Sequence, residues 1–360
     1  MRRAAALIVG GGPGGSAAAI GLARAGIEAE LIERSEGPHD VVCGGFLGWD
    51  ALAALSRLGL DPQALGARPI GRLRLISAKR SLEVALPSMA AGLSRRTLDE
   101  ALLGAAAEAG ARVARGRAVR AADCRRLQVR LESGEEVAAG ALVLATGKHE
   151  LRGAPRPVDI SARPLGLRTA LVPDRALARS LDGIIELHLY DGGYAGLLMQ
   201  EDGTANLCLS ASRKRLKEAG GIEKLVERLA DELPALAERL AQGEASGWSA
   251  VSGIPYGWRA TATAAGVYRV GDQAAVIASL AGDGIAIALE SGTAAARAIA
   301  CGRPAGDFQR EWARRARRPV GLAELLRRSA EHATSRDAMM GLLGWFPSLA
   351  PLAAKLTRIG

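Results

Sequence analysis

The sequence predicts an α/β fold in which a domain with a parallel sheet is interrupted by an antiparallel β-sheet domain and followed by a helical tail. Three observations support this prediction. A glycine-rich strand–helix–strand unit opens the chain, and two later apolar strands end at glycines. The middle of the chain consists of short alternating segments separated by Gly-containing turns. With 360 residues, the chain is long enough for more than one domain.

The first 33 residues form a complete nucleotide-binding unit. The apolar run over 4–9 predicts a buried parallel strand, and Gly10, Gly12 and Gly15 follow it at the GxGxxG spacing. These glycines permit a tight turn, close approach of a pyrophosphate and close packing of the next helix, whose N-terminus faces the phosphates. A second strand is followed by Glu33, where a carboxylate would accept the hydroxyls of an adenosine ribose.

Residues 34–147 contain four further features of interest. The Cys-Gly-Gly step at 43–45 needs permissive backbone, which indicates that something lies close against it. Residues 71–87 alternate on both sides of a polar turn and predict a β-hairpin outside the first domain. Arg95 opens a helix, and the apolar strand over 141–145 ends at Thr146-Gly147, which again brings backbone near a ligand.

Residues 164–211 predict an antiparallel meander. Strands over 184–190 and 194–200 flank the turn at 191–193, and a third strand covers 204–210. A helix is expected over about 221–242. The meander is the second sheet that the fold prediction requires.

The last glycine signals follow the meander. A strand over 267–270 ends at Gly271-Asp272, and Gly282, Gly284 and Ile285 begin a helix of small residues that reaches about Cys301. Backbone amides at the start of this helix can face an anion or a polarised ring. Asp283 is expected to cap the same helix. The tail beyond it predicts a basic, amphipathic helical segment.

Composition limits the function classes. The net charge of +9 favours acidic partners, but an aromatic content of 3% argues against base-stacking surfaces, and no nucleic acid is expected. The four cysteines form no CxxC pair, so we expect no metal site and a reducing, cytoplasmic environment. No run approaches the length of a transmembrane helix. For the basic tail, packing on its own domain and peripheral contact with a membrane surface are both open.

Together, the N-terminal glycines, the Ala-Thr-Gly strand end and the late Val-Gly-Asp resemble the FAD-dependent oxidoreductase superfamily that includes para-hydroxybenzoate hydroxylase and the geranylgeranyl reductases. This resemblance spans roughly residues 4–300 and implies FAD as the cofactor. It places Asp272 at the ribityl and pyrophosphate region and the 282–285 segment beside the isoalloxazine. The FAD-binding residues that it implies are Gly10, Gly12, Gly15, Glu33, Arg34, Cys43, Gly44, Arg95, Thr146, Gly147, Asp272, Gly282, Gly284 and Ile285.

Within that superfamily, the Cys-Gly-Gly step most resembles the geranylgeranyl reductase-like branch, in which the cysteine lies near the flavin. Two departures are evident. The reductases' aromatic-rich strand is matched only by 193–199, which lacks the Trp and Pro, and Ser279 stands where a proline is usual. The Trp-x-Trp-x-x-Pro motif of flavin-dependent halogenases is not evident, so halogenation is not expected.

The resemblance also implies a domain division. Residues 1–70, 94–160 and 259–303 would form a discontinuous, Rossmann-like FAD-binding domain. Residues 71–93 and 161–258 would form the substrate-binding β-sheet domain. Residues 304–360 would form the C-terminal helical segment.

The leading function is reduction of a C=C bond in a hydrophobic, prenyl- or polyketide-like substrate. Two alternatives stay open: hydroxylation of an aromatic compound that depends on NAD(P)H and oxygen, and a flavoprotein that transfers electrons or senses redox state without turnover. In either enzyme, NAD(P)H is a candidate electron donor. The catalytic candidates are Cys43, as proton donor or pocket lining, and Tyr194 and His188, which lie on adjacent strands expected to face the substrate pocket.

Overall fold

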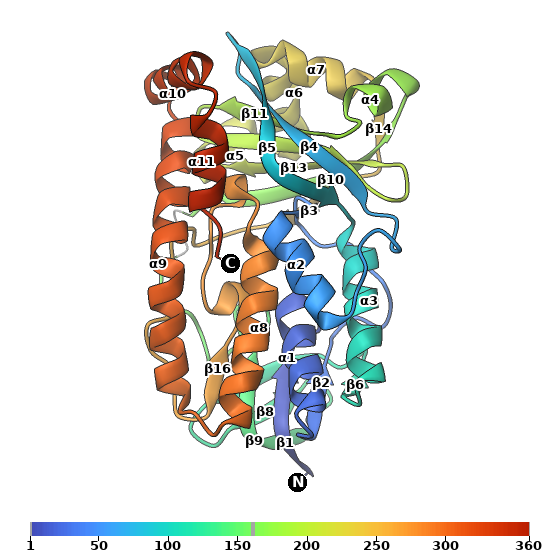
Figure 1. The fold of residues 1–360 in the computed structure, drawn as a ribbon, viewed down its shortest axis with the longest axis vertical. Helices are drawn as coiled ribbons and strands as arrows, with labels where there is room; N and C mark the ends of the chain where they lie inside the picture. The colour runs from blue at the N-terminus through green and yellow to red at the C-terminus, as the bar shows by residue number, and fades with distance from the viewer. Residues whose placement is uncertain (1, 160–162, 360) are drawn as a thin grey trace.

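The computed structural model describes residues 2–159 and 163–359. Two β-sheets lie one above the other along the long axis of the molecule, and helices flank both (Figure 1). The N-terminal strand belongs to the lower sheet. The α/β fold with a parallel sheet and a second, largely antiparallel sheet is confirmed.

The first sheet has the hydrogen-bonded order β6-β2-β1-β9-β8-β7, and β16 also pairs with β9. Its central strands are parallel, whereas β7 and β8 extend it in antiparallel fashion. The strands are β1 (Arg2–Val9), β2 (Ala29–Ile32), β6 (Arg112–Ala114), β7 (Val119–Asp123), β8 (Gln128–Leu131), β9 (Glu136–Leu144) and β16 (Val267–Arg269).

The turn between β1 and helix α1 (Pro13–Arg24) has no room for side chains. Gly10 has a φ of +106°, and a Cβ there would lie 2.5 Å from the carbonyl oxygen of Ala145. A Cβ on Gly15 would lie 1.9 Å from the carbonyl oxygen of Gly10. The strand and the helix therefore approach closely only because these positions are glycines.

One face of the first sheet is covered by α1, α3 (Arg95–Glu108) and α8 (Gly284–Ala300), which share a continuous apolar core with the sheet. Helix α2 (Trp49–Leu58) packs on α8. The long helix α9 (Ala305–Ala330) runs beside α8 and β16 and reaches the level of the second sheet (Figure 1). Its buried residues include Phe308 and Trp312, so its apolar face packs on the rest of the protein.

The second sheet has the order β14-β10-β13-β12-β11-β4-β5-β3, and β15 also pairs with β10. Its pairs are antiparallel except for β4 with β11. The strands are β3 (Phe46–Leu47), β4 (Arg68–Ile76), β5 (Ser81–Gly92), β10 (Leu165–Pro173), β11 (Ile184–Tyr190), β12 (Gly193–Met199), β13 (Ala205–Ala211), β14 (Gly243–Ala245) and β15 (Ser249–Val251).

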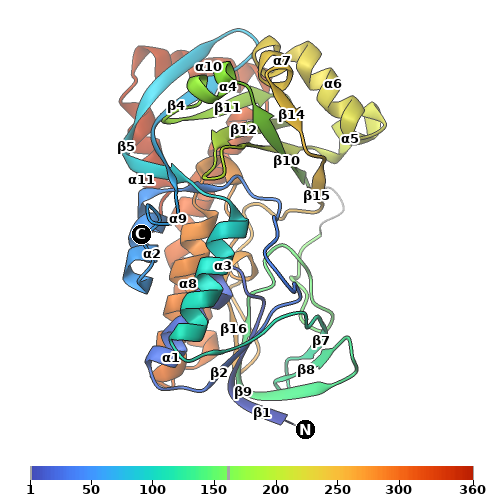
Figure 2. The ribbon, with the colours of Figure 1, turned by 90° about the vertical axis from the view of Figure 1, so that its right-hand side faces the viewer.

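Helices cover the second sheet from different sides (Figure 2). A core of leucines joins its outer face to α4 (Arg175–Ser180), α5 (Arg213–Ala219), α6 (Ile222–Glu232) and α7 (Pro234–Ala241). The single helix expected over 221–242 is therefore wrong, because Pro234 cannot continue α6 and instead starts α7. Helices α10 (Ala333–Trp345) and α11 (Leu349–Leu356) pack against β5.

The predicted domain division stays a prediction, although the sheets show which segments lie together. The hairpin predicted over 71–87 extends from Arg68 to Gly92, and β3 joins the same sheet from within the segment assigned to the first domain. The predicted boundary between residues 160 and 161 lies outside the described residues.

Candidate functional site

A cavity of about 920 Å³ extends between the two sheets. The ends of β1, β2, β9 and β16 line one part of it, and one face of the second sheet lines the other. Side chains from α10 and α11 complete the wall. The cavity thus joins the glycine-rich loop to a mainly apolar chamber.

The glycine-rich loop presents backbone donors to this cavity. Gly12 is the N-cap residue of α1 and makes no side-chain cap hydrogen bond. The carboxylate of Glu33 accepts from the backbone N–H of Gly11 at 2.6 Å and from that of Ser35 at 2.8 Å. Glu33 therefore fixes the loop while lining the same cavity.

Arg95 places a positive charge beside the glycine-rich loop, and Asp99 fixes its position. Its guanidinium donates two hydrogen bonds to Asp99, at 2.8 and 2.7 Å. Burial opposes the charged form, but Asp99 and the Cys43 thiol outweigh it, so the pKa of Arg95 is raised. Arg95 is permanently cationic at the place where the resemblance locates the cofactor.

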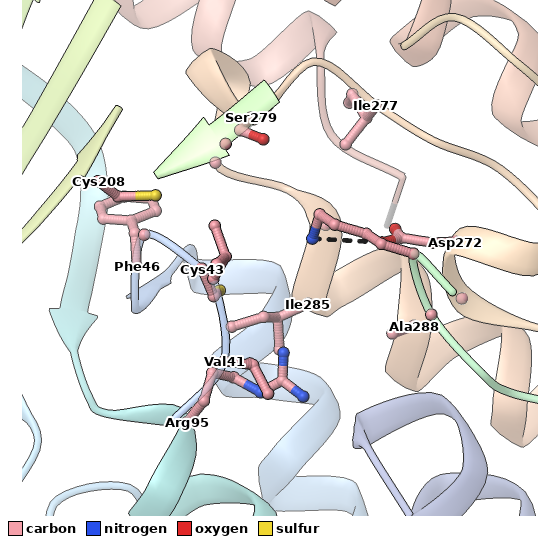
Figure 3. A pocket seen from close by; sticks show the side chains of 18 of the residues that line it. Val41, Cys43, Phe46, Arg95, Cys208, Asp272, Ile277, Ser279, Ile285 and Ala288 are labelled. Carbon is pink, nitrogen blue, oxygen red and sulfur yellow. Dashed lines mark ion pairs between the residues drawn. The ribbon is translucent and has the colours of Figure 1, made fainter. Parts of the chain in front are cut away.

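Cys43 lines the cavity near Arg95 and Ile285 (Figure 3). Its loop is fixed from the second sheet by Asn206, whose amide donates to the carbonyl oxygens of Cys43 at 3.0 Å and Gly44 at 2.8 Å. The sequence reasoning missed Asn206, because an asparagine within an apolar strand gives no sign of the loop that it binds. Asn206 thus joins the Cys43–Gly44 loop to β13 of the second sheet.

An ion pair joins the segment that follows β9 to the segment that follows β16. The ammonium of Lys148 lies 3.4 Å from the carboxylate of Asp272, as the dashed line at Asp272 in Figure 3 marks. Arg156, almost completely buried, donates to the carbonyl oxygens of Asp272 and Lys148. Burial alone would lower the pKa of Lys148, but the interactions with Asp272, Cys43 and Tyr256 together outweigh this effect, so the pKa is raised. Lys148 is a cavity cation that the sequence reasoning did not select.

The start of α8 also faces the cavity, through Gly282, Gly284 and Ile285. The expectation that Asp283 caps this helix is wrong, since its side chain makes no cap hydrogen bond. Its carboxylate instead accepts from Arg358 and from the backbone N–H of Ile359. The reason lies in the tertiary structure: the segment after α11 brings a cation and an N–H to this carboxylate.

Tyr194 lies in the chamber wall with a buried hydroxyl that has no hydrogen-bond partner among the described residues. Beside it, the hydroxyls of Tyr256 and Ser279 lie 2.9 Å apart, and both residues line the cavity. Burial raises the pKa of Tyr194 well above its ordinary value. Its phenol therefore stays protonated and keeps a hydrogen-bond donor at the cavity wall.

His188 does not face the pocket, and that prediction is corrected. The side chains of Leu187 and Leu189 line the cavity, so the alternation of the strand turns His188 to the opposite face. There its ring lies 3.1 Å from Glu186, which also binds Arg74 and Arg239. Both faces of β11 are buried, and the sequence therefore did not show which one lines the cavity.

The chamber end of the cavity is apolar. It is lined by aliphatic residues of the second sheet and of the C-terminal helices, which include Leu73, Leu75, Ile185, Leu187, Leu189, Leu198, Met339, Leu342, Leu343 and Leu349. Apolar walls of this kind exclude water and bind hydrocarbon. The contribution of α10 and α11 was not foreseen.

The structure gathers most predicted site residues around one cavity. Those that line it are Gly10, Gly12, Glu33, Arg34, Cys43, Gly44, Arg95, Thr146, Gly147, Tyr194, Asp272, Gly282, Gly284 and Ile285. Gly15 lies behind the loop, where it permits the helix packing, and does not line the cavity. Within the described residues, no cluster of three or more His, Cys, Asp or Glu side chains is arranged to hold a metal ion.

The arrangement fits FAD. Unblocked amides at the start of α1 and the Arg34, Arg95 and Lys148 cations suit a diphosphate, and a carboxylate at Asp272 suits sugar hydroxyls. Residues 3–151 match a family model described as FAD binding domain. The chain is an FAD-dependent oxidoreductase. This assignment confirms both the predicted cofactor and the predicted enzyme class.

Similar curated proteins include two reductases. The menaquinone reductase of Mycobacterium tuberculosis is 28% identical, with alignment over 98% of this chain and 88% of that protein. The digeranylgeranylglycerophospholipid reductase 2 of Methanopyrus kandleri is 27% identical, over 85% of this chain and 76% of that protein. This flavoenzyme thus aligns with both over most of their lengths.

Solved structures with the same fold include a geranylgeranyl bacteriochlorophyll reductase-like protein from Thermoplasma acidophilum. It has a TM-score of 0.76 and 20% identity and covers 94% of this chain and 90% of its own. The flavin-dependent brominase Bmp2 has a TM-score of 0.81 and 18% identity, over 99% and 93%. At these identities the likeness shows the fold alone. Among the described helices of the flavoenzyme, none is long and apolar enough to cross a membrane.

Proposed function

We propose that this flavoenzyme reduces a C=C bond in the prenyl chain of a membrane lipid or quinone. The observation that carries the proposal is the single cavity that runs from the glycine-rich loop past Cys43 into the apolar chamber under α10 and α11. A long hydrocarbon chain would fill that chamber. The names of the similar menaquinone and digeranylgeranylglycerophospholipid reductases support a prenylated substrate.

The cofactor would be held by the glycine-rich loop, Arg95, Lys148 and Asp272. When bound, FAD supplies hydride transfer to and from carbon. The amides at the start of α8 would stabilise negative charge on the reduced ring, because a helix N-terminus favours anions. The residues of the first sheet thereby bind and orient, while those of the second sheet receive the substrate.

Tyr194 would supply the proton that completes the reduction. Tyr194 lines the cavity, its buried hydroxyl makes no hydrogen bond within the described part of the chain, and the hydroxyl pair of Tyr256 and Ser279 lies beside it. Cys43 lines the cavity near Arg95 and Ile285, where its thiol would contact the reacting segment. The aliphatic wall would exclude water from the reaction.

The experiment is an anaerobic turnover with the purified holoenzyme, chemically reduced at its flavin and mixed with menaquinone that carries an unsaturated chain. Reoxidation of the flavin and a product heavier by two hydrogens, located in the chain by fragmentation, support the proposal. In a parallel reaction with an aromatic compound, a product that gains one oxygen atom only when O2 is present would establish the alternative hydroxylase instead. Formation of neither product would contradict both reactions.

We also propose NAD(P)H as the electron donor. A flavin reductase needs two electrons for each turnover, and nicotinamide dinucleotides are the soluble hydride donors that flavins accept. Anaerobic bleaching of the oxidised flavin by NADPH or NADH, at a rate no slower than turnover, would support this donor. A spectrum that stays oxidised would exclude both nucleotides.

Peripheral membrane contact is the last part of the proposal. We place it at the turn between α10 and α11, residues 345–349, which we call the elbow, rather than on the basic α9. The arginines of α9 are partly neutralised by ion pairs such as Arg310 with Asp307 and Arg327 with Glu324. At the elbow, Trp345 is 81% exposed and Phe346 is 56% exposed. These aromatics adjoin the helices that line the apolar chamber, so a lipid chain could pass directly from a bilayer.

A further inference from the structure

The segment that follows α11 returns to the start of α8. The guanidinium of Arg358 donates to the carbonyl oxygen of Gly282 at 3.1 Å and to the Asp283 carboxylate at 3.0 Å. The backbone N–H of Ile359 donates to the second Asp283 oxygen at 2.9 Å. Two consecutive residues thus hold the loop that precedes the helix.

Packing fixes the position of the Arg358 side chain. It is 7% exposed, and its guanidinium lies over the rings of Trp49, 4.4 Å from the centroid, and Phe46, 5.9 Å from the centroid. Gly282 has a φ of +69°, and Phe46 fills the space where its side chain would be. Cation, rings and loop therefore form one packed unit at the cavity wall.

The electrostatic reason for this unit is the pair of buried acids. Asp283 is 1% exposed, and Asp50 lies within 4.0 Å of the same guanidinium. A carboxylate removed from water destabilises the fold unless a cation and hydrogen-bond donors compensate it. Among the described residues near this loop, Arg358 supplies that charge, so the conformation of the loop depends on it.

We infer that Arg358 is a positioning residue for the flavin, which holds the Gly282–Gly284 loop so that the amides at the start of α8 face the cofactor. Arg358 and residues of α11 line the same cavity as the loop, and the segment after α11 therefore ties the chamber wall to the cofactor side of the site. This inference rests on FAD binding and is independent of the proposed substrate.

The test compares Arg358→Ala and Arg358→Lys with the wild type by FAD titration of the apoprotein and by measurement of the flavin reduction potential without substrate. We expect about tenfold weaker FAD binding for Arg358→Ala, because charged hydrogen bonds to the loop are lost. We also expect a shifted potential and partial recovery of both values in Arg358→Lys. Arg310→Ala, which removes an exposed arginine of α9, is the matched control.

Unchanged FAD affinity and potential in Arg358→Ala would overturn the inference, even if the apoprotein melted at a lower temperature. If that variant does not fold, Asp283→Asn provides the same test from the other partner. It keeps the side-chain size but replaces one of the two oxygens, which accept from Arg358 and the Ile359 N–H, with an amide donor. Failure of menaquinone turnover in the wild type would leave these measurements unaffected. The positioning role and the proposed reaction can therefore fail separately.

Discussion

The Lys148 ammonium lies 3.4 Å from the Asp272 carboxylate and joins the ends of two strands that are far apart in the sequence. Lys148 follows β9, and Asp272 lies after β16, which pairs with β9 in parallel. The pair brings one cation and one anion to the cavity wall. Both groups lie where a cofactor with phosphates and hydroxyls would meet them.

Asp272→Ala should weaken FAD retention by about tenfold or more, because it removes a charged acceptor for the cofactor and leaves Lys148 without its counter-ion. Fluorescence titration and the flavin content of the purified protein measure the effect. Asp307→Ala removes an exposed carboxylate of α9 and serves as the control. Wild-type flavin content in Asp272→Ala would argue against this assignment.

Cys43→Ala should slow turnover while FAD stays bound, because the thiol lines the cavity near Ile285, whereas the glycine-rich loop, the Arg95–Asp99 hydrogen bonds and the Lys148–Asp272 pair are unchanged. Steady-state rates at matched flavin content provide the measurement. Cys301→Ala is the control, since Cys301 is an exposed free cysteine. Equal rates in the Cys43 variant and the wild type would show that Cys43 serves only in packing.

Tyr194→Phe should lower turnover by about 100-fold, the loss expected when a general acid is removed, with FAD affinity unchanged. Tyr190→Phe is a suitable comparison, because the Tyr190 hydroxyl bonds to the carbonyl of Ser210 and does not line the cavity. We expect Tyr190→Phe to lose some stability and little rate. A Tyr194 variant as fast as the wild type would exclude the phenol as proton donor.

Glu186 should contribute stability that disappears in acid. Burial alone would raise its pKa, but hydrogen bonds from His188 and Arg239 lower the pKa to about 2. Because the folded state has the lower pKa, this stabilisation is complete above the ordinary pKa of 4.5 and is lost as the pH falls from there toward 2.

Glu186→Gln should therefore destabilise the protein by about 3 kcal/mol at pH 7, since it leaves buried cations without a charge partner. The difference from the wild type should shrink toward pH 3 in urea unfolding experiments. Glu132→Gln, which alters an exposed ion pair with Arg120, should have little effect at either pH. A pH-independent difference would contradict the assignment.

Replacing both Trp345 and Phe346 by Ser should abolish most binding to anionic vesicles, because these exposed rings would insert at the interface. Sedimentation with phosphatidylglycerol-containing vesicles measures the bound fraction. Val172→Ser removes an exposed apolar side chain at the end of β10 and is the control. Retention of binding by the double variant would move the contact to another surface.

Local patterns predicted which backbone segments meet at the cavity. The glycine loop, the Thr146-Gly147 strand end and the Gly271-Asp272 step each depend on backbone geometry that short sequences specify, and all three line one cavity. His188 was placed on the wrong face because β11 is buried on both sides. In such a strand, alternation shows that two faces exist without showing which one lines a pocket.

The residues that the sequence did not predict form contacts with partners far away in the chain. Asn206 binds the Cys43 loop, and Arg358 binds the loop at Asp283. No local pattern marks such a pair, because each partner resembles an ordinary polar residue in its own segment. The lining of the chamber by α10 and α11 has the same cause, since an amphipathic helix does not specify the surface on which it packs.

The Arg358 contact with Asp283 also bears on biosynthesis. The glycine-rich loop leaves the ribosome early, but the opposite side of the cofactor site is held by a residue synthesised nearly 350 positions after Gly10. A nascent chain therefore cannot assemble the complete site before Arg358 has emerged. FAD that binds before that point would be held only by residues that precede Arg358 in the chain, and therefore more weakly.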